Sequence, residues 1–458
     1  MQRASAIKFM LSRFRPSPIK IRVSGMTLRT LLRHLALLLA VILSMAAGLV
    51  AACTPVRHIL VTADPSAAGP AAHPDLFENL PSDPAERLQA WQEQRADLHA
   101  QLDAVLYGAS PPSPARVELG PPALLLGSIE SGQRSLATVD ITMESGEALS
   151  LQLALVTPDN DAPLRGVLLV PTECGLPAAL HDDAMPAPVH FTPGYCNSGD
   201  GGFLFELVGG LFGEWISGPP VHQALERGYG VVSWHESEIA PDSNALHAES
   251  LDRLGLDPNA ADRAGTISLW AWTVSRVADA LQQDARFADL PLVAYGHSRR
   301  GKAVLLAAAR DDRITVTLSH QAGTGGSSLH GDRTGEPISM ITESYPHWFV
   351  PAYAAYGDRE SELPIDQHAL IALVAPRAVL LGGAWRDTWS DPAGSFRAAQ
   401  GASAAWEIYG ETGLAQNRLA DFDPSGRLAQ HIRPGTHGVT DQDWDAFFAF
   451  MDAHIDAP

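Results

Sequence analysis

Cysteine is scarce in this sequence, which has only three among its 458 residues: Cys53, Cys174 and Cys196. So few cysteines exclude a disulfide scaffold. No CxxC or HExxH spacing occurs either, which argues against a zinc site. Cys174 and Cys196 both lie in loop-like sequence rich in Gly and Pro, where they could pair in an oxidising compartment or stay free.

Acidic residues are absent from positions 1–52, which carry eight Lys or Arg. The remainder has 24 basic residues against 52 acidic ones, a formal charge of −28. A body this acidic repels phosphate backbones, so we expect no nucleic-acid partner. With 46% apolar and 18% charged residues, the chain is neither disordered nor a coiled coil, and its length suits one large domain or two ordinary ones.

The basic leader runs into an apolar stretch at residues 35–52, which is the arrangement of an export signal. Val50-Ala51-Ala52-Cys53 resembles a bacterial lipobox, in which the cysteine thiol is acylated. The alternative is an uncleaved membrane anchor, because these 18 largely apolar residues could just span a bilayer. We predict an export signal of the lipoprotein type at residues 1–52, with Met26 as an alternative start and Cys53 as the lipidated residue.

A lipid on Cys53 would hold the body outside the cytoplasm, tethered to a bacterial membrane. Thr54 stands where an Asp would retain a lipoprotein at the inner membrane, so by analogy we expect the outer membrane, on its periplasmic or surface face. Residues 53–84 are rich in Pro, Ala and Asp and are predicted to form a tether. Residues 85–458 then form a single domain, which we expect to be a monomer.

The patterning of that domain changes along the chain. Residues 86–108 have apolar side chains at helical spacing and stop at Gly108, whereas residues 116–157 alternate apolar and polar, as antiparallel strands do. Beyond them, short apolar strands alternate with helices such as 266–281; the predicted strands are residues 166–170, 230–234, 292–295, 314–318 and 378–381. Such strands are buried on both faces, so we predict an α/β fold with a mostly parallel sheet and antiparallel N-terminal strands.

The segment at residues 292–302, LVAYGHSRRGK, has the pattern of a nucleophile elbow. An apolar strand leads into Gly-x-Ser and then directly into a helix, which would leave the Ser298 hydroxyl at a helix N-terminus that favours a developing anion. Arg300 stands where a second glycine is usual. The alternative is an ordinary strand–helix turn in which Ser298 only caps the helix.

A serine nucleophile needs a base and an acid that orients the base. His437 lies in a Gly-flanked loop after the last predicted strand and fits the base, while His431 falls within that strand and is better explained as structural. Asp387 is the first carboxylate after the strand at residues 378–381 and fits the acid. Asp391, which precedes a proline, is the alternative acid and fits a turn or helix cap better.

Further motifs accompany this triad in a fixed order; they are GHSRRGK at 296–302, GTGG at 323–326, HWF at 347–349, ALVAPR at 372–377 and DTWSDP at 387–392. Together they resemble the glucuronoyl esterases, carbohydrate esterase family 15, and most closely its bacterial members. The resemblance covers about residues 85–456. It implies an α/β-hydrolase catalytic domain, a three-layer sandwich, that needs no metal or organic cofactor and cleaves esters between the glucuronic acid of xylan and lignin alcohols.

The resemblance also assigns roles to residues near the triad. Arg299 would stabilise the oxyanion through its backbone N–H and guanidinium, while Lys302, Glu336 and Trp389 would hold the sugar. The alternatives are a solvated helix lysine for Lys302, a solvated loop carboxylate for Glu336 and a packing aromatic for Trp389.

Gln321 departs from the family pattern, because many members have the triad acid at this position. The acid role therefore falls to Asp387. Two other functions stay open: an acetyl or feruloyl esterase on the same fold, and a lipid-anchored glycan-binding pseudoenzyme with a degraded triad. The substrate of the favoured reading is a glucuronoxylan or lignin–carbohydrate ester.

Overall fold

A computed structural model of the chain describes residues 74–125, 132–159, 162–192, 196, 213–330 and 335–456. The predicted export signal, the lipobox with Cys53 and residues 53–73 of the predicted tether lie outside these residues. Among the helices that the structure does describe, none is long and apolar enough to cross a membrane. Residues 74–83 contact the domain, since the carbonyl oxygen of Pro74 lies 2.7 Å from Nε2 of His368 and Leu76 is buried.

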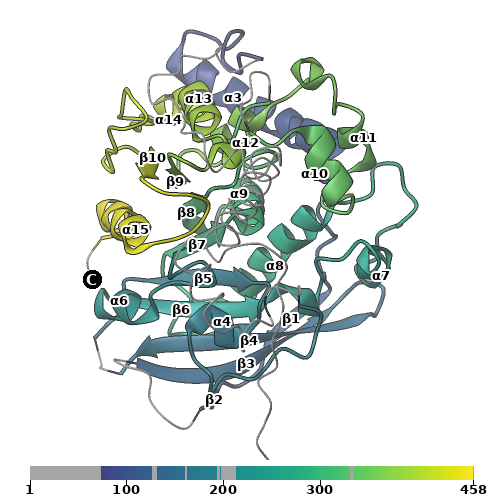
Figure 1. Cartoon of the computed structure of the whole chain (residues 1–458), viewed down its shortest axis with the longest axis vertical. Helices are drawn as coiled ribbons and strands as arrows, with labels where there is room; N and C mark the ends of the chain where they lie inside the picture. The colour runs from purple at the N-terminus through teal and green to yellow at the C-terminus, as the bar shows by residue number, and fades with distance from the viewer. Residues whose placement is uncertain are drawn as a thin grey trace, which may run out of the picture. The chain divides into compact units, whose positions relative to one another are not determined.

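Ten strands of the described chain form one mixed sheet in the order β1-β3-β4-β6-β5-β7-β8-β9-β10, with β2 paired to β3 (Figure 1). The strands are β1 (Arg116–Leu119), β2 (Ala123–Leu124), β3 (Gly132–Thr142), β4 (Ala148–Pro158), β5 (Gly166–Thr172), β6 (Tyr229–His235), β7 (Leu292–His297), β8 (Ile314–His320), β9 (Ala378–Ala384) and β10 (Leu428–Arg433). Pairing is antiparallel from β1 to β6 and parallel from β6 to β10. The predicted parallel sheet with antiparallel N-terminal strands is confirmed.

The burial of the strands follows from this arrangement. Along β3, buried and exposed side chains largely alternate, because one face of this outer strand meets solvent. In β5, β6, β7 and β9 every residue is buried, because helices cover both faces of the parallel part. This burial on both faces explains why the sequence of these strands is mostly apolar.

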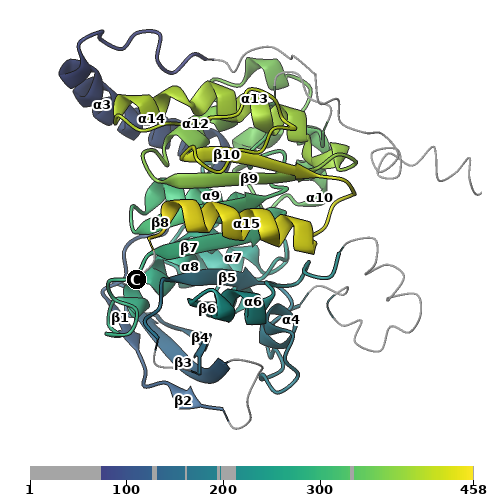
Figure 2. The same ribbon diagram turned by 90° about the vertical axis from the view of Figure 1, so that its left-hand side faces the viewer.

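The helices form two layers around the sheet. They are α3 (Pro84–Leu102), which continues as a π-turn at Asp103–Tyr107, α4 (Leu176–Leu180), α6 (Val221–Glu226), α7 (His247–Arg253), α8 (Thr266–Leu281), α9 (Arg299–Arg310), α10 (Ile338–Ser344), α11 (Pro351–Ala354), α12 (Gln367–Ala372), α13 (Pro392–Ala402), α14 (Ala404–Ile408) and α15 (Asp441–His454). Figure 2 shows α4, α6 and α15 on one face of the sheet. On the other face α3, α8, α9 and α12 share a second core, and β5 divides its side chains between the two.

Candidate active site

Ser298 lies between β7 and α9 in a backbone conformation that few residues other than glycine adopt. Its φ is 57° and its ψ −122°, and its N–H donates to the carbonyl oxygen of His320 at 2.8 Å. A Cβ at Gly296 would overlap the carbonyl oxygen of Arg300, so the tight turn requires glycine there. Such strain is typical of a nucleophile elbow and leaves the partly exposed Ser298 at the start of a 12-residue helix.

His437 and Asp387 come together at the carboxyl edge of the sheet. Asp387 follows β9 and His437 follows β10, and Nδ1 of His437 lies 2.8 Å from Oδ2 of Asp387. Burial raises the pKa of Asp387, but the charge and hydrogen bonds of His437 and Ser390 outweigh it, so this pKa lies below its usual value. The carboxylate is therefore ionised at neutral pH and holds the proton of His437 on Nδ1.

The ring of His437 also lies beside the nucleophile elbow. Its centroid is 4.6 Å from that of His297, the residue immediately before Ser298. With Nδ1 engaged by Asp387, Nε2 is the nitrogen that can accept a proton. The structure thus brings the three predicted triad residues to one edge of the sheet, at the ends of β7, β9 and β10.

The two alternatives named from the sequence lie elsewhere. Oδ1 of Asp391 accepts a hydrogen bond from the N–H of Gly394 at 3.0 Å and caps α13. His431 lies in β10, 3.7 Å from Asp443, and burial lowers its pKa to about 4. Asp391 is a helix cap and His431 is packed within the sheet.

Lys302, Glu336 and Trp389 surround the same region. Lys302 is buried rather than solvated, and its Nζ donates to the carbonyl oxygens of Ala322 and, at 2.6 Å, Thr324. Burial lowers the pKa of Lys302 to about 8, although Glu336 counteracts this. Burial likewise raises the pKa of the Glu336 carboxyl, against the effect of Lys302. The two groups therefore feel each other's charge.

Trp389 joins this pair through the loop after β9. The N–H of Glu336 donates to the carbonyl oxygen of Trp389 at 2.9 Å, and the Trp389 side chain is hydrogen-bonded to the Glu336 carboxyl. Unlike Glu336, Trp389 is partly exposed. The three residues assigned to sugar binding thus form one connected group, whose roles stay a prediction.

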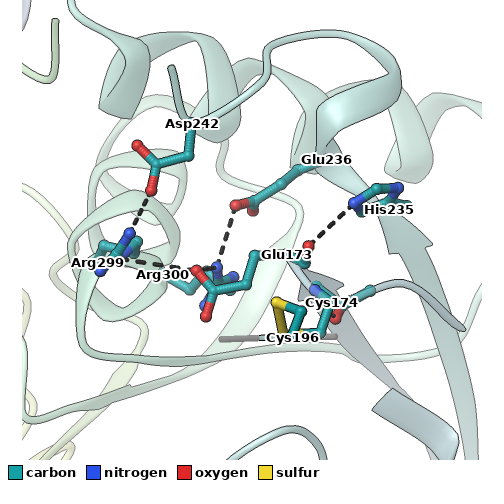
Figure 3. The surroundings of a disulfide bond; sticks show 9 residues. Glu173, Cys174, Cys196, His235, Glu236, Asp242, Arg299 and Arg300 are labelled. Carbon is teal, nitrogen blue, oxygen red and sulfur yellow. Dashed lines mark hydrogen bonds and ion pairs between the residues drawn. A yellow bond between two sulfur atoms is a disulfide. The ribbon is translucent and has the colours of Figure 1, made fainter. Parts of the chain in front are cut away.

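Arg299 is held by a carboxylate that the sequence analysis missed. Its guanidinium pairs with Asp242 and lies over the rings of Trp348 and Tyr345, 4.8 and 5.2 Å from their centroids (Figure 3 shows the Asp242 pair). Asp242 also lies 2.8 Å from Nε2 of His347 and accepts from Trp348 Nε1 at 2.7 Å. The only signal in the sequence was a carboxylate in the loop after an apolar strand.

Arg300, in place of the usual glycine, has two acidic partners, of which Glu236 is buried. Its guanidinium pairs with Glu173 and lies 3.2 Å from Oε1 of Glu236 (Figure 3). Burial raises the pKa of Glu236 to about 7, although Arg300 lowers it in part. The arginine that replaces the usual glycine is therefore held in place by its ion pairs with Glu173 and Glu236.

A disulfide bond joins Cys174 and Cys196, whose Cα atoms are 5.1 Å apart (Figure 3). The sequence left this pairing open. Glu173 directly precedes Cys174, and besides Arg300 it lies 3.7 Å from Nε of Arg299. The disulfide therefore fixes the chain next to the carboxylate that both arginines share.

Across residues 74–456, apart from the gaps given above, no three His, Cys, Asp or Glu side chains are grouped so that they could hold a metal ion.

Comparisons with known proteins find similar esterases. Residues 217–410 match the family model described as glucuronyl esterase, fungi. Carbohydrate esterase MZ0003, from an unknown prokaryotic organism, is 38% identical over 249 residues, 53% of this chain and 56% of that protein. The alignment thus spans little more than half of MZ0003.

Two further relatives cover more of the chain. The 4-O-methyl-glucuronoyl methylesterase of Schizophyllum commune is 24% identical over 352 residues, 74% of each protein. Among solved structures, a promiscuous CE15 esterase from a marine bacterial metagenome superposes with a TM-score of 0.71 at 27% identity, covering 86% of this chain and 99% of the other.

Proposed function

We propose that the chain is a glucuronoyl esterase of carbohydrate esterase family 15 and that it hydrolyses esters of 4-O-methylglucuronic acid in xylan–lignin linkages. The predicted α/β-hydrolase fold is shared with the solved esterases of that family. The observation that carries the proposal is the hydrogen bond between His437 and Asp387 beside a strained Ser298. This arrangement suits acyl transfer to a serine hydroxyl.

The proposed reaction has two steps. Nε2 of His437 takes the proton of Ser298 as its Oγ attacks the ester carbonyl carbon, and the carbonyl electrons move to oxygen. When they return, the bond to the alcohol breaks and His437 gives the proton to the leaving oxygen. A water molecule then loses a proton to His437 as it attacks the carbonyl carbon of the glucuronoyl-enzyme. The bond to Ser298 Oγ breaks, His437 gives the proton to Oγ, and the free uronic acid leaves.

The N-terminus of α9 and Arg299 would receive the oxyanion. The helix begins at Arg299, so its first N–H groups lack partners within the helix and its dipole favours negative charge at Ser298. Each donor aimed at an oxyanion typically contributes a few kcal/mol. Because Asp242 holds the Arg299 guanidinium in one orientation, this donor is fixed before the substrate arrives.

Lys302, Glu336 and Trp389 would bind the sugar. Lys302 and Glu336 are buried and both feel the charge of Arg299 in the elbow, and the partly exposed Trp389 offers an apolar ring face of the kind that packs on a pyranose.

The proposal is tested by turnover of three substrates by the purified domain: benzyl glucuronate, an aryl acetate and a feruloyl ester. We expect the glucuronate to be preferred, and its turnover to be lost in Ser298→Ala but not in the matched control Ser425→Ala, an exposed serine. If the protein preferred the acetate or the feruloyl ester, its substrate would be an acetyl or feruloyl ester and not a glucuronate ester. Absence of all three activities would favour a glycan-binding pseudoenzyme.

We also propose that the protein is exported and held by a lipid on Cys53, with residues 53–73 as the tether. Residues 74–84, which the sequence assigned to the tether, pack against the catalytic domain of residues 85–458. The leader sequence supports this proposal, and the disulfide fits an oxidising compartment. Radiolabelled palmitate should enter the wild-type chain in cells but not Cys53→Ala. Equal labelling of both would contradict lipidation at this residue.

A further inference from the structure

Gln321 lies at the centre of the contacts between the nucleophile elbow and the histidine loop, yet the proposed mechanism gives it no role. It follows β8, is 3% exposed and has a φ of 50°. Its backbone is held on two sides, because its N–H donates to the carbonyl oxygen of Gly382 at 2.8 Å and its own carbonyl oxygen accepts from Ser390 Oγ at 3.2 Å. The side chain is therefore aimed by a fixed backbone.

Two backbone partners determine which end of the Gln321 amide is oxygen. Oε1 lies 2.8 Å from the N–H of Gly438, which can only donate. Nε2 lies 3.2 Å from the carbonyl oxygen of Thr436, which can only accept. The amide thus binds the residues on both sides of His437, and its orientation is set by the backbone.

The same oxygen sets the tautomer of His297. Nε2 of His297 lies 2.9 Å from Oε1 of Gln321, and because Oε1 is an acceptor, this nitrogen must carry a proton. Burial holds the pKa of His297 well below its usual range, and the neighbouring His437 lowers it further. His297 is therefore neutral and donates towards Gln321, while its ring packs 4.6 Å from that of His437.

We propose that Gln321 is a positioning residue of the esterase: its neutral amide ties the loop of His437 to the residue before Ser298. This inference rests on the proposed function. An amide is required because one group must accept from Gly438 and His297 and donate to Thr436. An ionised carboxylate can accept but cannot donate, so a glutamate would place its second oxygen against the Thr436 carbonyl.

A negative charge at residue 321 would act on the histidines as well. It would favour a proton on both nitrogens of His297, directly beside the ring of His437, and like charges at this distance oppose each other. The imidazolium that forms on His437 during the reaction would then be harder to form. The other ionisable groups that act on His297 are His320 on β8 and Arg300 on α9, while Asp387 after β9 is paired with His437.

The test compares Gln321→Glu with Gln321→Met, which keeps the volume and removes all three hydrogen bonds. Gln133→Glu, at an exposed position of β3, is the matched control. We would measure kcat and KM on benzyl glucuronate between pH 5 and 8, together with thermal unfolding. We expect both Gln321 variants to lower kcat at pH 8 by about tenfold to a hundredfold through misplacement of His437, with KM changed less than about twofold.

The pH profile separates positioning from a purely structural role. The deficit of Gln321→Glu relative to wild type should shrink as the pH falls, because a protonated carboxyl can again donate to Thr436. The deficit of Gln321→Met should be the same at every pH. An unchanged kcat in Gln321→Glu at pH 8, or a pH-independent deficit, would overturn the proposal, as would rescue of Asp387→Asn by Gln321→Glu, since residue 321 would then serve as an acid.

A second readout does not depend on the substrate class. A fluorophosphonate phosphonylates an activated serine, so its rate of reaction with Ser298 reports the alignment of the triad even if benzyl glucuronate is not turned over. Labelling of the wild type without turnover would refute the proposed substrate while the variants still test Gln321. Slower labelling of both variants supports the positioning role, and equal labelling of all forms would refute it.

Discussion

Asp387 reaches His437 across 50 residues of sequence, and its Oδ2 lies 2.8 Å from the Nδ1 of that ring. An asparagine at residue 387 would offer an NH₂ group to the same nitrogen and favour the wrong tautomer. We expect Asp387→Asn to lower kcat on benzyl glucuronate by about three to four orders of magnitude.

Asp391→Asn is the matched control for this change. It alters the cap of α13 and should cost at most about 1 kcal/mol of unfolding free energy while leaving kcat within a factor of about two. If the two variants lost kcat equally, or if Asp387→Asn kept the wild-type rate, the assignment of the acid would be wrong.

Glu336→Gln tests the predicted sugar site. The loss of a charged hydrogen-bonding partner should raise KM for benzyl glucuronate about tenfold or more, while the hydrolysis of a small aryl acetate stays unchanged. Glu343→Gln, an exposed position on α10, is the control and should change neither constant. Equal losses on both substrates would mean that Glu336 supports the elbow and does not bind the sugar.

Arg300→Gly would restore the usual glycine of the elbow but leave the buried carboxylate of Glu236 without its arginine and Glu173 with Arg299 alone. We expect a loss of about 3–5 kcal/mol in the free energy of unfolding, measured in urea. Arg286→Gly removes an exposed pair with Asp284 and should cost about 1 kcal/mol or less. A stable Arg300→Gly protein would show that the fold does not depend on the ion pairs of this residue.

The disulfide encloses a segment whose ends are 22 residues apart in sequence. In the chain-entropy account, removal of such a cross-link costs about 3 kcal/mol. We expect the double variant Cys174→Ser/Cys196→Ser to lose this stability in urea unfolding, and wild-type protein reduced with dithiothreitol to match it. An unchanged midpoint after reduction would contradict the prediction.

Glu238 should make the stability of the domain depend on pH. Burial raises its pKa from 4.5 to about 7, although the N–H of Gln152 partly offsets this. The folded state therefore binds the proton more tightly, so stability falls as the pH rises from about 4.5 to about 7 and stays lower above that range.

Glu238→Gln removes this ionisation and keeps an acceptor for Gln152. The variant should gain stability relative to wild type at pH 8 compared with pH 5, by less than about 3 kcal/mol. Unfolding free energies at the two pH values measure this gain. A difference between variant and wild type that is the same at both would contradict the pKa direction.

Local pattern was enough to predict the sheet, although the predicted parallel strands end one to three residues before the observed ones. The apolar runs at β5, β7 and β9 follow directly from burial on both faces, and residues at the carboxyl ends of parallel strands meet at one edge. Ser298, Asp387 and His437 could be placed together for that reason. The alternation along β3 identified the antiparallel part in the same way.

The ion pairs of Arg299 and Arg300 with their acidic partners could not be predicted from the sequence pattern. Asp242 and Glu173 lie in loops and Glu236 lies in a single 3₁₀ turn, where no period links a residue to its partner. The role of Gln321 was hidden for a different reason. Its partners are mostly backbone groups of Thr436 and Gly438, which carry no sequence signature at all.

The start of α9 concentrates the chemistry of this protein in one turn. Ser298 precedes the helix, and Arg299, Arg300 and Lys302 lie in its first four residues. Any rotation of the helix would carry all four side chains with it, so one turn of backbone determines where they lie relative to one another. A substitution that displaces this turn, such as Gly296→Ala, would therefore move the nucleophile, both arginines and Lys302 together.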